Sequence, residues 1–149
     1  MATIFITGSN GLIGKALCEQ LKDSAYQIKR LDINLPSNHP DYGDINHTEL
    51  IDRHLEDCDG IVHLAAVSRV VWGQQQPELC WQTNVVGTAH ILEYAYQSPR
   101  KPWLLYASSR EVYGEQQQLP VTESALLSPV NIYARSKVAA ETIVNQYQA

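Results

Sequence analysis

Short apolar runs alternate along this chain with longer amphipathic segments. Four runs are rich in β-branched or aliphatic residues, as expected of buried strands, and they cover residues 2–7, 26–32, 60–65 and 103–108. Between the strands apolar residues recur at helical spacing, which predicts helices over residues 11–22, 77–97 and 129–148. Asn46 and Glu49 have the spacing of a capping box and predict the start of a further helix.

This order of elements predicts an α/β fold. Strand–helix alternation with nearly continuous apolar strands is typical of a doubly wound parallel sheet that helices cover on both faces. Ligands of such sheets bind at the carboxyl ends of the strands, so we expect chemistry in the loops after Thr7, Asp32, Ala66 and Ser108. The two long helices should bury faces formed by Val85, Ala89, Leu92 and Tyr96 and by Ile132, Ala139, Ile143 and Val144.

Composition narrows the class of protein. The 149 residues suit one domain, and the net charge of −5 offers no basic surface for nucleic acid or an anionic membrane. The N-terminus has neither a basic leader nor an apolar run long enough to span a bilayer. Three cysteines (Cys18, Cys58 and Cys80) and five histidines fit no metal-ligand spacing. We therefore expect reduced thiols, no metal site and a cytoplasmic location.

Residues 7–14 (TGSNGLIG) lie between the first strand and the first helix. Gly8 allows a tight turn, Gly11 lets the backbone approach a pyrophosphate, and Gly14 lets the helix pack against the strand. The amide groups at the helix N-terminus suit the phosphates. The segment predicts a dinucleotide cradle, and a glycine-rich turn without a ligand is the alternative.

Asp32 ends the second predicted strand. A carboxylate there can accept hydrogen bonds from both hydroxyls of an adenosine ribose, and it repels a 2′-phosphate, which favours NAD over NADP. No arginine directly follows the acid to reverse this preference, although Arg30 precedes it. A solvated loop aspartate is the alternative.

Tyr133 and Lys137 are four residues apart in the last predicted helix and should project from one face of it. A fixed ammonium beside a phenol favours the phenolate, which is a base able to take a proton from an alcohol. The spacing alone also fits an ordinary neighbour pair on a surface helix. The pair therefore gains weight only beside the dinucleotide motifs.

Taken in order, these motifs resemble the N-terminal portion of extended short-chain dehydrogenase/reductases, the nucleotide-sugar epimerase and dehydratase group. The resemblance covers essentially all 149 residues. It rests on TGSNGLIG at 7–14, Asp32, GDI at 43–45, HLAA at 63–66, Asn84 in TNVVGT, SSREVYG at 108–114, and Tyr133 with Lys137.

The resemblance implies a Rossmann domain with NAD as cofactor. The implied cofactor-binding residues are Gly8, Asn10, Gly11, Leu12, Ile13, Gly14, Asp32, Asp44, Ile45, Leu64, Ala65, Ala66, Asn84, Tyr133 and Lys137. Asp44 would accept a hydrogen bond from the adenine amino group, and the small side chains of Ala65 and Ala66 would avoid a clash with the cofactor. His63 is expected to be a core strand residue.

The resemblance also implies a catalytic set of Ser109, Tyr133, Lys137 and Glu111, with a nucleotide-sugar as substrate. Tyr133 would take the proton of a sugar hydroxyl while the carbon-bound hydride passes to the nicotinamide. Lys137 would hold the nicotinamide ribose, and Ser109 would bridge the substrate hydroxyl and the tyrosine.

Arg110 and Glu111 bear on the outcome of that reaction. The 4,6-dehydratases that this segment resembles carry Asp-Glu there, and a guanidinium is no general acid. The pair therefore favours 4-epimerisation over 4,6-dehydration, while decarboxylation-type and simple dehydrogenase chemistry stay open. The alternative for Glu111 is a structural pairing with Arg110 or another cation.

Family members continue well beyond this length, so we expect residues 1–149 to be an NAD-binding domain truncated before a C-terminal substrate domain that is absent. Two classes of function follow: an NAD-dependent epimerase/dehydratase-type enzyme, or a noncatalytic NAD-binding fragment or sensing module. Retention of Ser109, Tyr133 and Lys137 favours the enzyme. The family often dimerises through the helices that fall near 77–97 and 129–148, and a homodimer is expected.

Overall fold

Four parallel strands form one sheet, in the order β2-β1-β3-β4, in the computed structural model, which describes residues 1–147. The strands are β1 (Thr3–Thr7), β2 (Gln27–Leu31), β3 (Gly60–His63) and β4 (Trp103–Tyr106). Their register pairs Thr7 with both Leu31 and His63, and His63 with Tyr106. The carboxyl ends of all four strands therefore lie level along one edge of the sheet.

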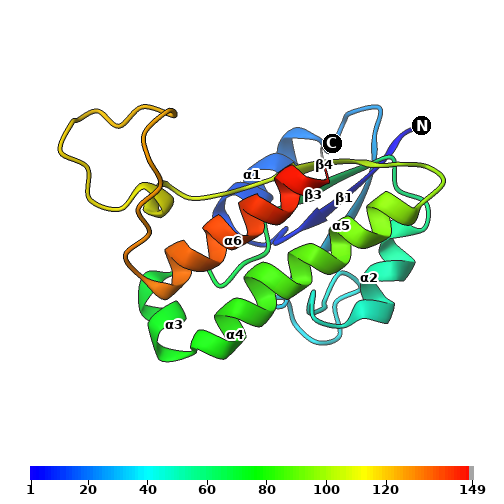
Figure 1. Cartoon of the computed structure of the whole chain (residues 1–149). Coiled ribbons are helices and arrows are strands. Elements are labelled where there is room, and N and C mark those ends of the chain that lie inside the picture. The colour runs from blue at the N-terminus through cyan, green and yellow to red at the C-terminus, as the bar shows by residue number, and fades with distance from the viewer. Residues whose placement is uncertain (148–149) are drawn as a thin grey trace.

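Helices cover both faces of this sheet. They are α1 (Leu12–Gln20), α2 (Thr48–Leu55), α3 (Val70–Gln75), α4 (Pro77–Trp81), the π-helix η1 (Gln82–Val86), α5 (Gly87–Gln97), the 3₁₀ helix η2 (Arg110–Tyr113) and α6 (Ile132–Gln146). Figure 1 shows α5 and α6 side by side on one face and α1 on the other, with the loop between η2 and α6 extending away from the body. The predicted α/β, doubly wound parallel fold is confirmed.

The strands bury alternate side chains on opposite faces. Phe5 and Ile61 belong to the cluster under α2 and α5, whereas Ile4, Ile6 and Val62 form the cluster that α1 covers. On the α1 side β4 is less well covered, because Trp103 and Leu105 are about half exposed. The core is thus thicker on the face that carries α5 and α6.

The helix predicted over 77–97 is present as the continuous run α4–η1–α5. Its middle turn is π-helical, a widened turn that is often found at functional sites, and it contains the buried residue Asn84. Val85 and Leu92 are buried as predicted, but Tyr96 is exposed. The π turn changes the angular position of later residues, so a face drawn at constant helical spacing drifts away from the core.

Two local expectations were wrong. The N-cap of α2 is His47 and makes no side-chain cap bond, because Asn46 instead donates to Asp44 Oδ1 and Thr83 Oγ1, at 2.9 and 3.2 Å. In α6 the buried residues are Tyr133, Ala134, Ser136, Lys137 and Ala140 rather than the apolar positions predicted. Long-range hydrogen bonds explain both differences. The predicted helix end at residue 148 lies outside the described residues.

Removing buried side-chain volume should test this account of the core. Ile91 on α5 is fully buried, and we expect Ile91→Ala to lower the free energy of unfolding by about 3 kcal/mol, because a cavity is left beside Phe5 and Ile61. The matched control is Ile13→Ala on the solvent side of α1, which should change it by less than about 0.5 kcal/mol. Urea unfolding monitored by circular dichroism would measure both, and equal losses would contradict the assignment.

Candidate functional site

The turn between β1 and α1 is shaped by contacts that leave no room for side chains. Gly8 has φ +69°, and a β-carbon there would lie 2.7 Å from the amide nitrogen of Ala65. A β-carbon at Gly14 would lie 2.2 Å from the carbonyl oxygen of Gly8. Both obstacles are backbone atoms, which cannot swing aside. The two glycines therefore let α1 and the loop after β3 close tightly around the turn.

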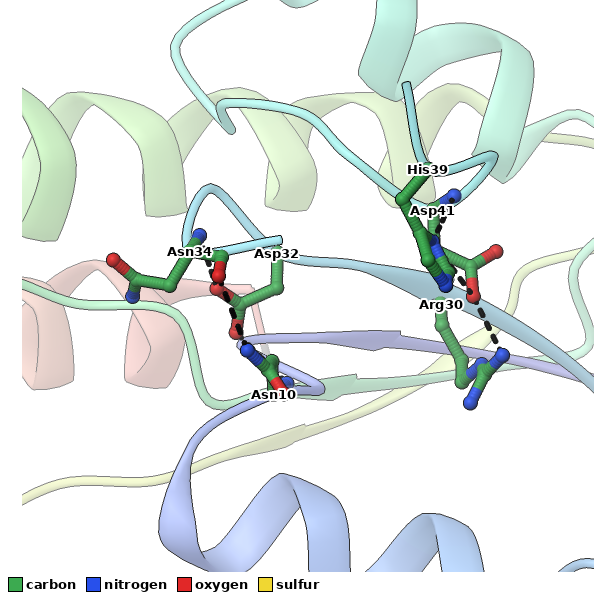
Figure 2. Close-up of polar contacts among 6 residues, drawn as sticks. All are labelled: Asn10, Arg30, Asp32, Asn34, His39 and Asp41. Atoms are coloured by element: carbon green, nitrogen blue, oxygen red, sulfur yellow. Dashed lines mark hydrogen bonds and ion pairs between the residues drawn. The ribbon is translucent and has the colours of Figure 1, made fainter. Parts of the chain in front are cut away.

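Asp32 lies beside this turn, directly after β2. Its Oδ2 accepts the Asn10 amide at 2.8 Å and its Oδ1 accepts the Asn34 amide at 2.7 Å, as Figure 2 shows. The Asn10 side chain also donates to the carbonyl oxygen of Asn34 at 3.2 Å. Two backbone donors fix the orientation of the carboxylate, and its remaining lone pairs stay available for the hydroxyls of a ligand.

A cleft of about 240 Å³ opens at the carboxyl ends of β1, β2 and β3. It brings together eight of the predicted cofactor residues: Gly8, Gly11, Asp32, Asp44, Ile45, Leu64, Ala65 and Ala66. It is also lined by residues that sequence reasoning did not select, among them Val67, Ser68, Leu79 and Thr83. Val67 and Ser68 could have been selected, because they lie in the loop after Ala66 where chemistry was expected. Leu79 and Thr83 reach the cleft only through the packing of α4 and η1.

The other seven predicted cofactor residues do not line the cleft: Asn10, Leu12, Ile13, Gly14, Asn84, Tyr133 and Lys137. Leu12 and Ile13 are 92% and 63% exposed at the start of α1, and Gly14 is buried behind them. Asn10 contributes through its bond to Asp32. Asp44 is oriented by Asn46, which donates to Asp44 Oδ1 through both its backbone and side-chain nitrogens.

A buried hydrogen-bond chain runs beneath the cleft through His63. Thr88 Oγ1 donates to the Asn84 carbonyl at 2.7 Å, so its single proton is used and His63 Nε2 must donate to it at 3.0 Å. His63 Nδ1 then accepts from Thr7 Oγ1 at 2.7 Å, and Thr7 Oγ1 accepts from the Ala65 amide at 3.2 Å. Burial, together with the charge of Lys137, lowers the pKa of His63 to about 3, so the ring stays neutral.

Asn84 links the cleft to the last helix. Its Oδ1 accepts the Val67 amide at 2.8 Å, and its Nδ2 donates to the Val67 carbonyl at 3.2 Å and to Ser136 Oγ at 2.9 Å. Ser136 in turn donates to the carbonyl oxygen of Tyr133 at 2.7 Å. Asn84 is almost fully buried and lines no part of the cleft, so it holds the loop that does.

Tyr133 and Lys137 lie together on the buried face of α6. Lys137 Nζ donates to the carbonyl oxygen of Ala107, just after β4, at 2.9 Å and lies 4.7 Å above the ring of Tyr106. Within residues 1–147 Ala107 is the one hydrogen-bond acceptor of this ammonium, which leaves two donors for a ligand. Burial disfavours the charged form and lowers the pKa of Lys137 to about 8.

Ser109 and Glu111 belong to the turn that packs against the start of α6. Ser109 Oγ accepts the Glu111 amide at 3.2 Å and caps η2. The Glu111 carboxylate pairs with Arg110 at 3.1 Å and accepts from Asn131 Nδ2 at 3.3 Å. Since Asn131 is the N-cap of α6, Glu111 helps to fix the beginning of the helix that carries Tyr133.

Comparison with known proteins identifies the family. A sequence profile of the NAD dependent epimerase/dehydratase family matches residues 4–149. The chain belongs to this family. The UDP-glucose 4-epimerase of Streptomyces lividans is 29% identical over 93% of this chain and 45% of its own length. The chain spans about half the length of the curated relatives it matches.

Solved structures of epimerase/dehydratase relatives share this fold. A UDP-glucose 4-epimerase of Brucella ovis in complex with NAD superposes with a TM-score of 0.87 at 26% identity, over 99% of this chain and 48% of that one. The RMD protein of Pseudomonas aeruginosa, complexed with NADPH, superposes with a TM-score of 0.81 at 28% identity over 99% and 48%. Both neighbours hold a nicotinamide dinucleotide.

The site fits the NAD cofactor of the epimerase/dehydratase family. The cradle at Gly8 and Gly14 would be filled by a single added carbon, and Asp32 presents an oriented carboxylate at the strand edge. Across residues 1–147 no group of three or more His, Cys, Asp or Glu side chains is arranged to hold a metal ion. In the same part of the chain no helix has the length and apolar character needed to cross a membrane.

The burial of Lys137 predicts a pH dependence of stability. The pKa of this group is 10.5 when unfolded and about 8 when folded, so between these values the unfolded chain binds more protons. Stability should therefore rise with pH in that window. We expect the unfolding free energy of the wild type, relative to that of Lys137→Met, to increase by on the order of 3 kcal/mol from below pH 8 to above pH 10.5.

The control for this measurement is Lys22→Met, which removes an exposed lysine. Denaturant titrations at a series of pH values would give the two difference curves. The difference in unfolding free energy between the wild type and Lys22→Met should not change with pH. If the difference from Lys137→Met does not change either, the burial of the Lys137 ammonium is contradicted.

Proposed function

We propose that this chain is the cofactor-binding and proton-transferring part of an NAD-dependent enzyme that oxidises a hydroxyl group of a nucleotide-sugar. The observation that carries the proposal is the buried pair of Tyr133 and Lys137 on α6, with Lys137 bonded to the Ala107 carbonyl at the carboxyl end of β4. A protein that only stores or senses NAD has no need for this pair.

Tyr133, Ser109 and Lys137 have separate roles in the proposed oxidation. Tyr133 takes the hydroxyl proton of the substrate, and Ser109 orients that hydroxyl. The ammonium of Lys137, held by the Ala107 carbonyl, offers its two remaining donors to the nicotinamide ribose. NAD, when bound, accepts the hydrogen of the adjacent carbon as hydride.

Among the reactions of the family we propose 4-epimerisation rather than 4,6-dehydration. Elimination needs an acid and a base beside the sugar, and Arg110 is a guanidinium that is 89% exposed. Glu111 is already engaged by Arg110 and Asn131, which favours a positioning role over a catalytic one. The relationship to UDP-glucose 4-epimerases supports the same choice.

Turnover of nucleotide-sugars by the purified chain tests this proposal. With NAD and a panel of UDP-, dTDP- and GDP-sugars, we expect interconversion of one pair of 4-epimers, followed by chromatography of the sugars. Tyr133→Phe removes the base and should slow the reaction about 10²- to 10⁴-fold. Tyr96→Phe, at an exposed tyrosine of α5, serves as the matched control and should keep the wild-type rate.

The same assay separates the second candidate, a noncatalytic NAD-binding module. This candidate is favoured by one observation: the lining of the cleft at the carboxyl ends of β1, β2 and β3 includes none of Ser109, Tyr133 and Lys137. NAD binding in calorimetry without turnover of any sugar would support it and contradict the enzyme.

The free thiols of Cys18, Cys58 and Cys80 support a cytoplasmic location for either candidate.

We further propose that the chain forms a homodimer through the α4–η1–α5 run and α6. Trp81 and Val86 on this run are large apolar side chains that are about half exposed, as expected at a contact between subunits. An isologous contact would pair these helices with their copies across a two-fold axis.

Sedimentation should reveal the dimer and its main contact. We expect Trp81→Ala to raise the dissociation constant of the dimer at least about tenfold, because buried tryptophans dominate interface energies. Trp103→Ala removes a similarly exposed tryptophan from β4, outside the proposed interface, and should leave the constant unchanged. A wild-type monomer at high concentration would exclude this assembly.

A further inference from the structure

A second hollow, of about 820 Å³, lies next to the cofactor cleft on the α1 side of β2. Its wall includes Asn10, Arg30, His39 and Asp41, with Lys15 on α1 and Lys22 just after that helix. We call it the β2 groove. None of its lining residues takes part in the proposed reaction, yet it begins where the adenosine ribose of a dinucleotide is expected.

The groove and the cleft meet at the contact between Asn10 and Asp32. Asn10 lines the groove, Asp32 lines the cleft, and the Asn10 amide is 2.8 Å from the Asp32 carboxylate. Arg30 and Asp32 are two residues apart in extended backbone, so their side chains lie on one side, as Figure 2 shows. A group attached to a ribose hydroxyl at Asp32 would therefore extend past Asn10 toward Arg30.

Such a group in NADP is the 2′-phosphate, and arginine is the side chain best suited to bind it. Arg30 is not free to do so. Its Nη2 lies 2.7 Å from Asp41 Oδ2. Asp41 is itself anchored, because its carbonyl oxygen accepts the Asp32 amide at 3.0 Å and its own amide donates to His39 Nδ1 at 3.0 Å. The ion pair is thus built into the backbone that positions Asp32.

We propose that Asp41 is a second determinant of dinucleotide choice, which holds Arg30 in an ion pair and so excludes the 2′-phosphate of NADP. Arg30, Asp32 and Asp41 together carry one net negative charge, and a phosphate monoester adds about −1.5 to −2. Removing the charge of Asp41 leaves Arg30 and Asp32 balanced and frees the guanidinium. The inference rests on the cofactor site of the proposed function.

Calorimetric titration of NAD and NADP into four forms of the chain tests this inference. The wild type should bind NAD more tightly than NADP. Asp41→Asn should lower the ratio of the NADP to the NAD dissociation constant about fivefold, the effect of one released charge-assisted contact. Arg30→Gln alone should not lower the ratio, and in the double variant Arg30→Gln/Asp41→Asn the gain should disappear.

Glu19→Gln is the charge-matched control. It removes one negative charge from the same groove, but Glu19 pairs with Lys22, at 3.7 Å, and not with Arg30. An equal change of the ratio in this variant would show a general charge effect and overturn the proposal. A ratio that Asp41→Asn leaves unchanged, or a gain that persists without Arg30, would overturn it as well. Absence of NAD binding by the wild type would instead refute the cofactor site itself.

Discussion

The buried hydrogen-bond chain through His63 sets the geometry of the sheet edge on which the site is built. A neutral imidazole between two hydroxyls has one proton to give, and the direction of every bond follows from the Thr88 donation to Asn84. This series of hydrogen bonds ends at the amide nitrogen of Ala65, and the same nitrogen leaves no space for a β-carbon at Gly8. Loss of one member would leave buried donors or acceptors unpaired, so the network acts as a unit.

The same network fixes the cleft relative to α6, the helix that carries the proposed base. Asn84 stands at the π-helical turn, where its backbone closes the His63 chain and its side chain holds both Val67 and Ser136. Val67 lines the cleft, whereas Ser136 bonds to the backbone of Tyr133. One buried amide therefore connects the loop after β3 to α6, which carries Tyr133.

Whether a feature could be predicted from the sequence depends on how far apart in the sequence its interacting residues lie. The strands, the glycine turn and the acid at the end of β2 follow from local patterns, since each depends on neighbours in sequence. The short helix α3 has no such pattern. Asn46 does not cap α2, because its side chain donates to partners that include Thr83, far along the chain. The buried face of α6 escaped prediction for the same reason: Ser136 and Lys137 are polar, and only their bonds to Asn84 and Ala107 make burial favourable.

These long-range bonds also hold α6 in place. Its N-cap Asn131 is held by Glu111, its middle by Asn84 through Ser136, and Lys137 by Ala107. Every one of these partners lies within the described chain, on η2, η1 or the end of β4. The orientation of Tyr133 and Lys137 thus depends on bonds that form within residues 1–147.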